Sequence, residues 1–236
     1  MEEQLSEIEL AADKHASLTI NPEFYSKIVL QLANDTKKAE ETAKNIKLIA
    51  RHVMLLDSFY ETNKLEYKDL AEKAKIELLK NIPNNYKGDF EKLYKKLSTF
   101  WVYEKSLMEK KKFSKEERVE YIRKKASDVF MYLFIAEFSV HIPKNIIDAL
   151  YALQQLNDIY DDIIDTKEDR ENGSPNLIFL FSWDYKDIKS LSGMENIEMY
   201  SLIEGLTSII RKNTMVEFPF IFEKGMEYQQ KIVNML

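Results

Sequence analysis

The sequence predicts an all-α fold, a single helical bundle over residues 1–236. Only 5 glycines and 5 prolines interrupt 236 residues, of which 45% are hydrophobic and 31% charged. Apolar residues recur at helical spacing almost from end to end. So few breakers argue against a turn-rich β protein, and we expect roughly seven to nine helices around one core.

The first half of the chain shows two breaks and one long helix. Asn21-Pro22 ends the first segment, and proline favours the start of a second helix near Glu23. A long amphipathic helix is predicted from about residue 36 to 62. Residues 81–88 (NIPNNYKG) combine Pro, Asn and Gly, which is typical of a loop.

The second half of the chain also contains recognisable starts and ends of helices. Residues 90–110 are predicted to be helical, and Ser114 with Glu117 matches the capping box that opens a helix. Pro143 lies near the start of the following helix. Residues 170–175 (RENGSP) are expected to end that helix.

Composition excludes several classes of function. The chain has no cysteine, which excludes disulfides, thiol catalysis and cysteine-ligated zinc. No apolar run approaches the length of a membrane span, and the acidic N-terminal sequence MEEQLSEIEL is unlike a signal peptide. The net charge of −6 argues against nucleic acid as a partner. We therefore expect a cytoplasmic protein.

Residues 154–165 (QQLNDIYDDIID) place four aspartates and an asparagine within an apolar helix. At 100° per residue, Asn157 falls inside the apolar sector, Asp161 beside it, and Gln154 and Asp165 at its edge. These oxygens form a ladder along the rim of a buried face. Carboxylates there need a cation because an unpaired buried charge is costly. Hard oxygen ligands suit Mg²⁺ bound with a substrate phosphate.

The other two acids of this helix are expected to point outward. Asp158 and Asp162 lie further from the apolar sector on the same wheel. An offset in helical phase would exchange their role with that of Asp161 and Asp165.

A second acidic pair lies in the long helix predicted earlier in the chain. Asp57 falls inside an apolar stripe, and Glu61 follows one turn later. A lone acid in such a stripe is often paired with Lys or Arg. Two helices that each carry acids on an apolar face can also chelate a metal between them. The stripe consists of Ile46, Ile49, Val53, Leu56 and Tyr60.

These motifs resemble those of a known enzyme family. The segment LQQLNDIYDDIIDTKEDRENGSPNLIFL resembles the second aspartate-rich region of squalene and phytoene synthases, and LLDSFYET resembles the first. The resemblance covers roughly residues 13–180. Trans-prenyltransferases and terpene cyclases share the same fold, so the resemblance implies a class I terpenoid synthase bundle with a central cavity.

The resemblance implies a Mg²⁺-dependent isoprenoid synthase that ionises an allylic prenyl diphosphate. The implied metal ligands are Asp57, Glu61, Asn157, Asp161 and Asp165. The catalytic residues would be Asp57, Asp161 and Tyr60. The substrate-binding residues would be Arg51, Lys125, Arg170, Phe134 and Gln154. We expect the carboxylates of Asp57 and Asp161 to lie on the order of 6–12 Å apart across the cavity.

Aromatic residues on the same helices would line a dry pocket for a carbocation. For each of them, ordinary core packing is the alternative. They are Phe59, Tyr60, Phe130, Phe134, Phe138 and Tyr151.

The chain departs from the family pattern at three points. It is shorter than typical members, and its first motif ends in Glu61 without further acids. The basic residue usual before that motif is Met54 here, so Arg51 is the nearest substitute. These departures leave chain length and reaction type open.

Two classes of function therefore remain. The enzyme would join two prenyl units, cyclise one, or transfer a prenyl group to another acceptor. The alternative is a non-catalytic bundle of the same fold that binds a prenyl lipid or a protein partner. A coiled-coil scaffold is disfavoured because sustained heptads are absent. The basic run at residues 110–112 is most simply a solvated surface, with peripheral membrane contact as the alternative, and a homodimer is a further expectation.

Overall fold

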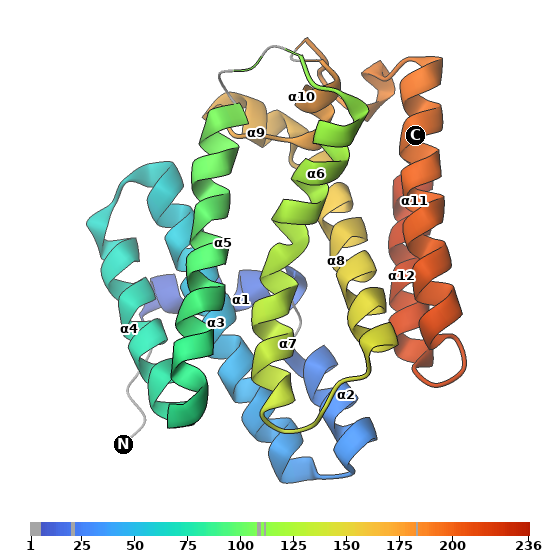
Figure 1. The fold of residues 1–236 in the computed structure, drawn as a ribbon. Helices are drawn as coiled ribbons and strands as arrows, with labels where there is room; N and C mark the ends of the chain where they lie inside the picture. Colours follow the sequence, from blue (N-terminus) through green and yellow to red (C-terminus); the bar gives the residue numbers. More distant parts are fainter. Residues whose placement is uncertain (1–5, 20–21, 108–109, 111, 183) are drawn as a thin grey trace. The chain divides into compact units, whose positions relative to one another are not determined.

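The computed structural model describes residues 6–19, 22–107, 110, 112–182 and 184–236, without the side chains of residues 15–19, 61, 101 and 105. The described part is helical and contains no strand, which confirms the all-α fold class (Figure 1). It has more helices than the seven to nine expected. No helix in these ranges is long and apolar enough to cross a membrane.

The α-helices have the following bounds: α1 (Glu7–Thr19), α2 (Pro22–Ala33), α3 (Thr36–Thr62), α4 (Leu65–Asn81), α5 (Lys87–Leu107), α6 (Lys115–Lys125), α7 (Val129–Glu137), α8 (Lys144–Ile164), α9 (Thr166–Asn172), α10 (Leu177–Phe181), α11 (Gly193–Thr214) and α12 (Pro219–Val233). Three 3₁₀ helices join them: η1 (Asn84–Tyr86), η2 (Ala126–Asp128) and η3 (Ile188–Ser190).

The chain divides into two compact units, each described by itself below. Unit 1 comprises Met1–Leu93 and Met131–Ile142, and unit 2 comprises Tyr94–Phe130 and Pro143–Leu236. The single domain expected from the sequence stays a prediction.

Local sequence signals explain where several helices begin and end. The predicted helix over residues 36–62 is confirmed as α3, whose N-terminus is capped by the Asp35 side chain. The predicted capping box is present, with Ser114 and Glu117 each accepting the other's backbone N–H. Pro143 stands immediately before α8, as predicted.

The core of unit 1 is organised around α3, which packs against α1, α2 and α4. Ile46, Ile49 and Ala50 are fully buried. The buried imidazole of His52 lies 2.7 Å from the carbonyl oxygen of Ala71 in α4. Because α3 has partners on several sides, polar residues in its middle are buried together with the apolar ones.

Arg51 is one of these buried residues, and it joins α3 to α1. Its Nε and Nη2 donate to the two carboxylate oxygens of Asp13 at 2.6 and 2.8 Å, and Glu9 Oε1 lies 3.9 Å from Nη1. Arg51 is only 6% exposed. This burial does not agree with the expected role of Arg51 in substrate binding, because two acids of α1 enclose its guanidinium.

Neutralising Asp13 should destabilise the protein because it leaves the buried charge of Arg51 poorly compensated. We expect Asp13→Asn to lower the free energy of unfolding by about 3 kcal/mol, measured by chemical denaturation. Glu41→Gln removes an exposed partner of Lys37 and should cost less than about 0.5 kcal/mol. Equal losses in the two variants would contradict a stabilising role for this ion pair.

Unit 2 is organised around α8, which packs against α11, α12, α6 and α10. The run Gln155–Ile159 is buried at five consecutive positions, so at this height α8 is covered around its whole circumference. Gly225 of α12 lies close to α11, where an added methyl group would meet the Ile210 side chain at 3.0 Å.

Candidate functional site

After the acid-bearing end of α8, the chain forms the short helix α9 and then folds back, so that residues 176 and 177 contact α8 again. Helix α9 follows directly and ends at Gly173, whose φ of 69° is the left-handed conformation that glycine adopts readily. Asn176 then caps α10, its side-chain oxygen accepting from the N–H of Ile178 at 2.9 Å. Residues 170–175 were expected to end the acid-bearing helix, but α8 already ends at Ile164, and the break at Gly173 ends the separate helix α9. The chain after this break places Asn176 against α8.

Asp162 is the centre of this arrangement and is only 2% exposed. Its Oδ1 accepts from Lys125 Nζ of α6 at 2.5 Å, and its Oδ2 accepts from the N–H of Leu177 at 3.0 Å. Its backbone carbonyl accepts from Asn176 Nδ2 at 2.5 Å. One aspartate therefore ties α6, α8 and the start of α10 together.

The charges and the burial around Asp162 shift the pKa values of neighbouring side chains. Burial, the largest single effect, lowers the pKa of Lys125, but the negative charges around it, with Asp162 the strongest, together outweigh burial and raise the pKa well above its ordinary value. Burial raises the pKa of Asp169 to about 6, although a hydrogen bond from Asn176 Nδ2 at 2.7 Å opposes the shift. Lys125 is thus held in its charged form beside Asp162.

Asp158 lies one turn before Asp162 and is 6% exposed. Its Oδ1 accepts from Gln154 Nε2 at 2.9 Å. Its Oδ2 is buried and has no hydrogen-bond partner among the described residues. Burial, followed by the charge of Asp128, raises the pKa of Asp158 well above its ordinary value, and Lys125 offsets this in part.

The helical phase expected for α8 is wrong. Asp158 and Asp162 were expected to point outward but are buried, whereas Asp161 and Asp165 are half-buried. Asn157 is buried, as expected. The apolar pattern marks the face toward α11 and α12, but α8 is also covered by α6 and α10, and the second acid pair lies under that cover.

The first acidic motif also differs from expectation. Asp57 is exposed rather than set in an apolar face, and Tyr60 is 38% exposed. Burial of α3 ends at Leu56, so the apolar spacing continues one turn beyond the buried part of the helix. The Glu61 side chain lies outside the described residues. Asp57 belongs to unit 1 and Asp161 to unit 2, so the distance between their carboxylates stays a prediction.

The remaining predicted ligand-binding residues have identified contacts. Arg170 is exposed, donates to the carbonyl of Tyr185 and lies 4.8 Å from the Phe179 ring centroid. Phe134 packs with the rings of Tyr86, Phe90 and Phe138 in unit 1. Phe134 is half-buried, and both its role in lining a pocket and the central cavity stay predictions.

Of the basic run at residues 110–112, Lys110 forms an ion pair with Glu117, and Lys111 lies outside the described residues.

The donors on α8 suit Mg²⁺ in kind, because they are carboxylate and amide oxygens. The uncompensated Asp158 Oδ2 marks a place where positive charge would be favourable. No group of three or more acids or histidines in the described ranges is arranged to hold a metal ion. Mg²⁺ commonly takes one or two carboxylates and completes its shell with substrate phosphate and water. Mg²⁺ binding at these residues therefore stays a prediction.

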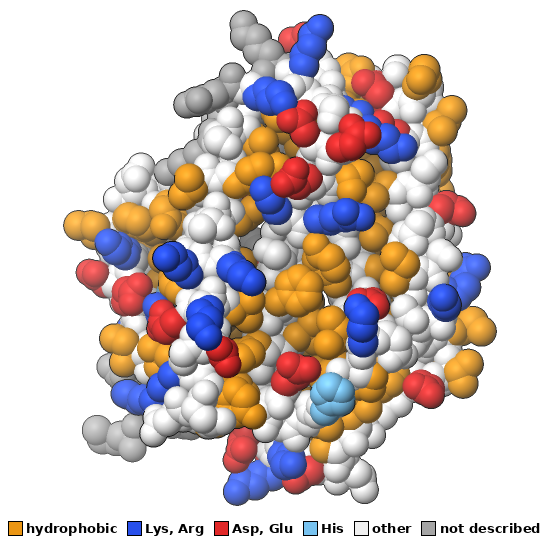
Figure 2. All heavy atoms as spheres, viewed as in Figure 1, with side chains coloured by type: hydrophobic (Ala, Val, Ile, Leu, Met, Phe, Trp, Pro, Cys, Tyr) orange, Lys and Arg blue, Asp and Glu red, His pale blue; other side chains and the backbone are white. Residues whose placement is uncertain are grey.

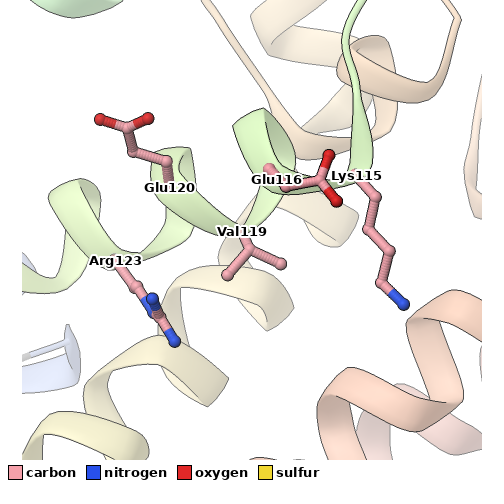
Figure 3. A pocket seen from close by; sticks show the side chains of 5 residues that line it. All are labelled: Lys115, Glu116, Val119, Glu120 and Arg123. Carbon is pink, nitrogen blue, oxygen red and sulfur yellow. The ribbon is translucent and has the colours of Figure 1, made fainter.

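A shallow hollow lies elsewhere in unit 2, on α6. Figure 3 shows Lys115, Val119 and Arg123 pointing to one side of the helix and Glu120 to the other. Glu116 completes the lining. None of the predicted site residues lines this hollow, and its mixed charges favour no ligand class.

Sequence reasoning missed one residue that organises the site. Asn176 is fully buried and bonds both Asp162 and Asp169. Its position directly after Pro175 and before an apolar run is a helix N-cap signal that could have been recognised. Its second role, holding acids of α8 and α9, has no signal in the local sequence.

Comparison of the chain with protein-family models, curated proteins and solved structures finds no match.

The raised pKa of Asp158 predicts a defined pH dependence. Between its ordinary pKa and its raised folded-state pKa, the folded protein holds a proton that the unfolded chain has released. The contribution of Asp158 to stability therefore falls as pH rises. We expect Asp158→Asn to be more stable than wild type by about 1–3 kcal/mol near pH 8. This advantage should shrink toward pH 4, as urea unfolding would show.

Asp148→Asn is the matched control, because Asp148 is a half-exposed acid on the same helix, paired with Lys144. Its difference from wild type should not vary with pH in the same way. If Asp158→Asn were destabilised equally at both pH values, the Asp158 carboxylate would be satisfied in the folded protein.

Proposed function

We propose that the chain is a Mg²⁺-dependent class I isoprenoid synthase that ionises an allylic prenyl diphosphate and releases diphosphate. The observation that carries the proposal is the pair Asp161 and Asp165, half-buried and four residues apart near the end of α8. Their backbone is held by the Asp162–Lys125 ion pair behind them. The spacing agrees with the family motif that the sequence resembles.

The buried and half-buried acids would have different roles. Asp162 has both oxygens occupied by Lys125 and Leu177, so it positions the helix and does not bind ligand. Asp161 and Asp165, with Asn157, would present oxygens toward a diphosphate-bound cation. When bound, Mg²⁺ would neutralise the leaving diphosphate.

A basic residue near this end of α8 would assist diphosphate binding. Arg170 is exposed on α9, one turn beyond Asp165, and stacking on Phe179 fixes its guanidinium. Arg51 is not available for this role because Asp13 and Glu9 enclose it. Asp57, exposed on α3, would supply the second acid of the family pattern.

A second candidate function is a non-catalytic bundle that binds a prenyl lipid or a protein partner. The burial of Arg51 favours it, because the first motif then lacks its nearest cation. The two candidates differ in turnover: only the synthase releases diphosphate.

Product analysis of purified protein with Mg²⁺ and prenyl diphosphates of increasing length would test the proposal. We expect diphosphate release that requires Mg²⁺, and a loss of at least about 100-fold in Asp161→Asn, because one acid would no longer offset the charge of the ion. Asp148→Asn, on the same helix, should keep wild-type turnover.

The outcome also distinguishes the two candidates. Absence of turnover with every substrate, together with a raised melting temperature on adding a prenyl diphosphate, would replace the synthase with the binding bundle. Equal turnover in wild type and Asp161→Asn would contradict the role given to this acid.

A further inference from the structure

Helix α11 exposes an unusual amount of apolar surface. Six of the fourteen large apolar side chains that are exposed in the described residues lie between residues 194 and 216. Isolated exposed apolar side chains, such as those scattered among charges in Figure 2, are normal in a folded protein. A concentration on one helix marks an interaction surface. The six are Met194 (84% exposed), Ile197 (66%), Tyr200 (40%), Ile209 (41%), Met215 (52%) and Val216 (85%).

These side chains lie on the side of α11 that faces away from its partners. Ile203, Leu206 and Ile210 are buried, in a helix that packs against α8 and α12. At 100° per residue, Met194, Ile197, Tyr200 and Ile209 occupy the opposite half of α11, and Met215 and Val216 lie in the turn that follows the helix. Small residues fill the middle of this face, and the apolar ones lie toward its two ends. The small residues are Ser201, Gly205 and Ser208.

Gly205 has no evident role within the chain. Glycine inside a helix is less stable than alanine, so a packing reason is expected. An added methyl group at Gly205 would meet nothing within 4 Å, in contrast to Gly225, where it would press on Ile210. Gly205 therefore leaves open space on this face of α11, into which another chain can pack closely.

The charges on the face identify the occupant. Glu204 lies four residues before Ser208, and Arg211 and Lys212 lie three and four residues after it. Glu204 and Lys212 form no ion pair within the described residues. In an antiparallel pair related by a two-fold axis near Ser208, Glu204 of each copy lies level with Arg211 and Lys212 of the other.

We propose that this face of α11 binds the same face of a second copy of the chain, forming an antiparallel two-fold dimer. The same axis places Tyr200 level with Val216 and Ser201 level with Met215 of the copy. The small residues let the helices approach and opposite charges meet twice, while Met194 and Ile197 extend beyond the α11 of the other copy. The inference does not depend on the proposed enzymatic function.

Sedimentation equilibrium over a concentration series tests the dimer through charge reversal. Wild type should dimerise, and Glu204→Lys should weaken the dimer at least about tenfold, because like charges then face each other twice. Adding Arg211→Glu and Lys212→Glu to that variant should restore dimerisation. Circular dichroism confirms that each variant is folded.

Gly205→Ala provides an independent test, because it should stabilise the monomer and weaken the dimer. At concentrations where the chain is monomeric, the melting temperature should rise by about 2–4 °C, because alanine favours the helix and meets no atom. The dimer should weaken, because the methyl groups separate the helices. A wild type that stays monomeric up to about 100 μM, or a dimer indifferent to both Glu204→Lys and Gly205→Ala, would overturn the proposal.

Discussion

The ion pair between Lys125 and Asp162 is the contact on which the acid-bearing part of unit 2 depends. Asp162 lies near two other carboxyl groups, Asp158 and Asp169, whose pKa values burial raises. Lys125 favours the ionised form of both carboxyl groups. A buried acid without such a partner would be protonated or would destabilise the fold. Because the Asp162 oxygens also receive the Leu177 N–H, the pair fixes the chain that folds back after α8.

The acids at the end of α8 fall into two groups, which differ in burial and in their relation to the Lys125–Asp162 pair. The buried group, Asp158 and Asp162, faces α6 and η2, where Lys125 binds Asp162 and burial raises the pKa of Asp158. The other group, Asp161 and Asp165, is half-buried, and the proposed function assigns ligand binding to it. Rigid support behind accessible acids is what a binding site requires, since ligand oxygens are positioned to within a fraction of an ångström.

The bounds and caps of individual helices could be predicted from the sequence, whereas the faces of each helix that other helices cover could not. The α3 bounds, the Ser114 capping box and the break at Gly173 were predictable because each rests on residues within one or two turns, whereas the end of α8 at Ile164 was not predicted. Which of the α8 acids are buried was not predictable. Helix α8 is covered on opposite faces, and its apolar periodicity indicates only one of these faces. The position of Asp57 was missed for a related reason: periodicity does not show where partner helices end.

The Lys125–Asp162 pair is tested most directly by a double-mutant cycle on unfolding free energy, with Asp162→Asn, Lys125→Met and the double variant. The account predicts that Asp162→Asn costs about 3–5 kcal/mol, because it leaves the Lys125 charge without its partner. The double variant should lose clearly less than the sum of the single losses. The exposed pair of the same helix, broken by Asp148→Asn, should cost at most about 0.5 kcal/mol. An Asp162→Asn loss as small as that of Asp148→Asn, with additive single losses, would contradict the account.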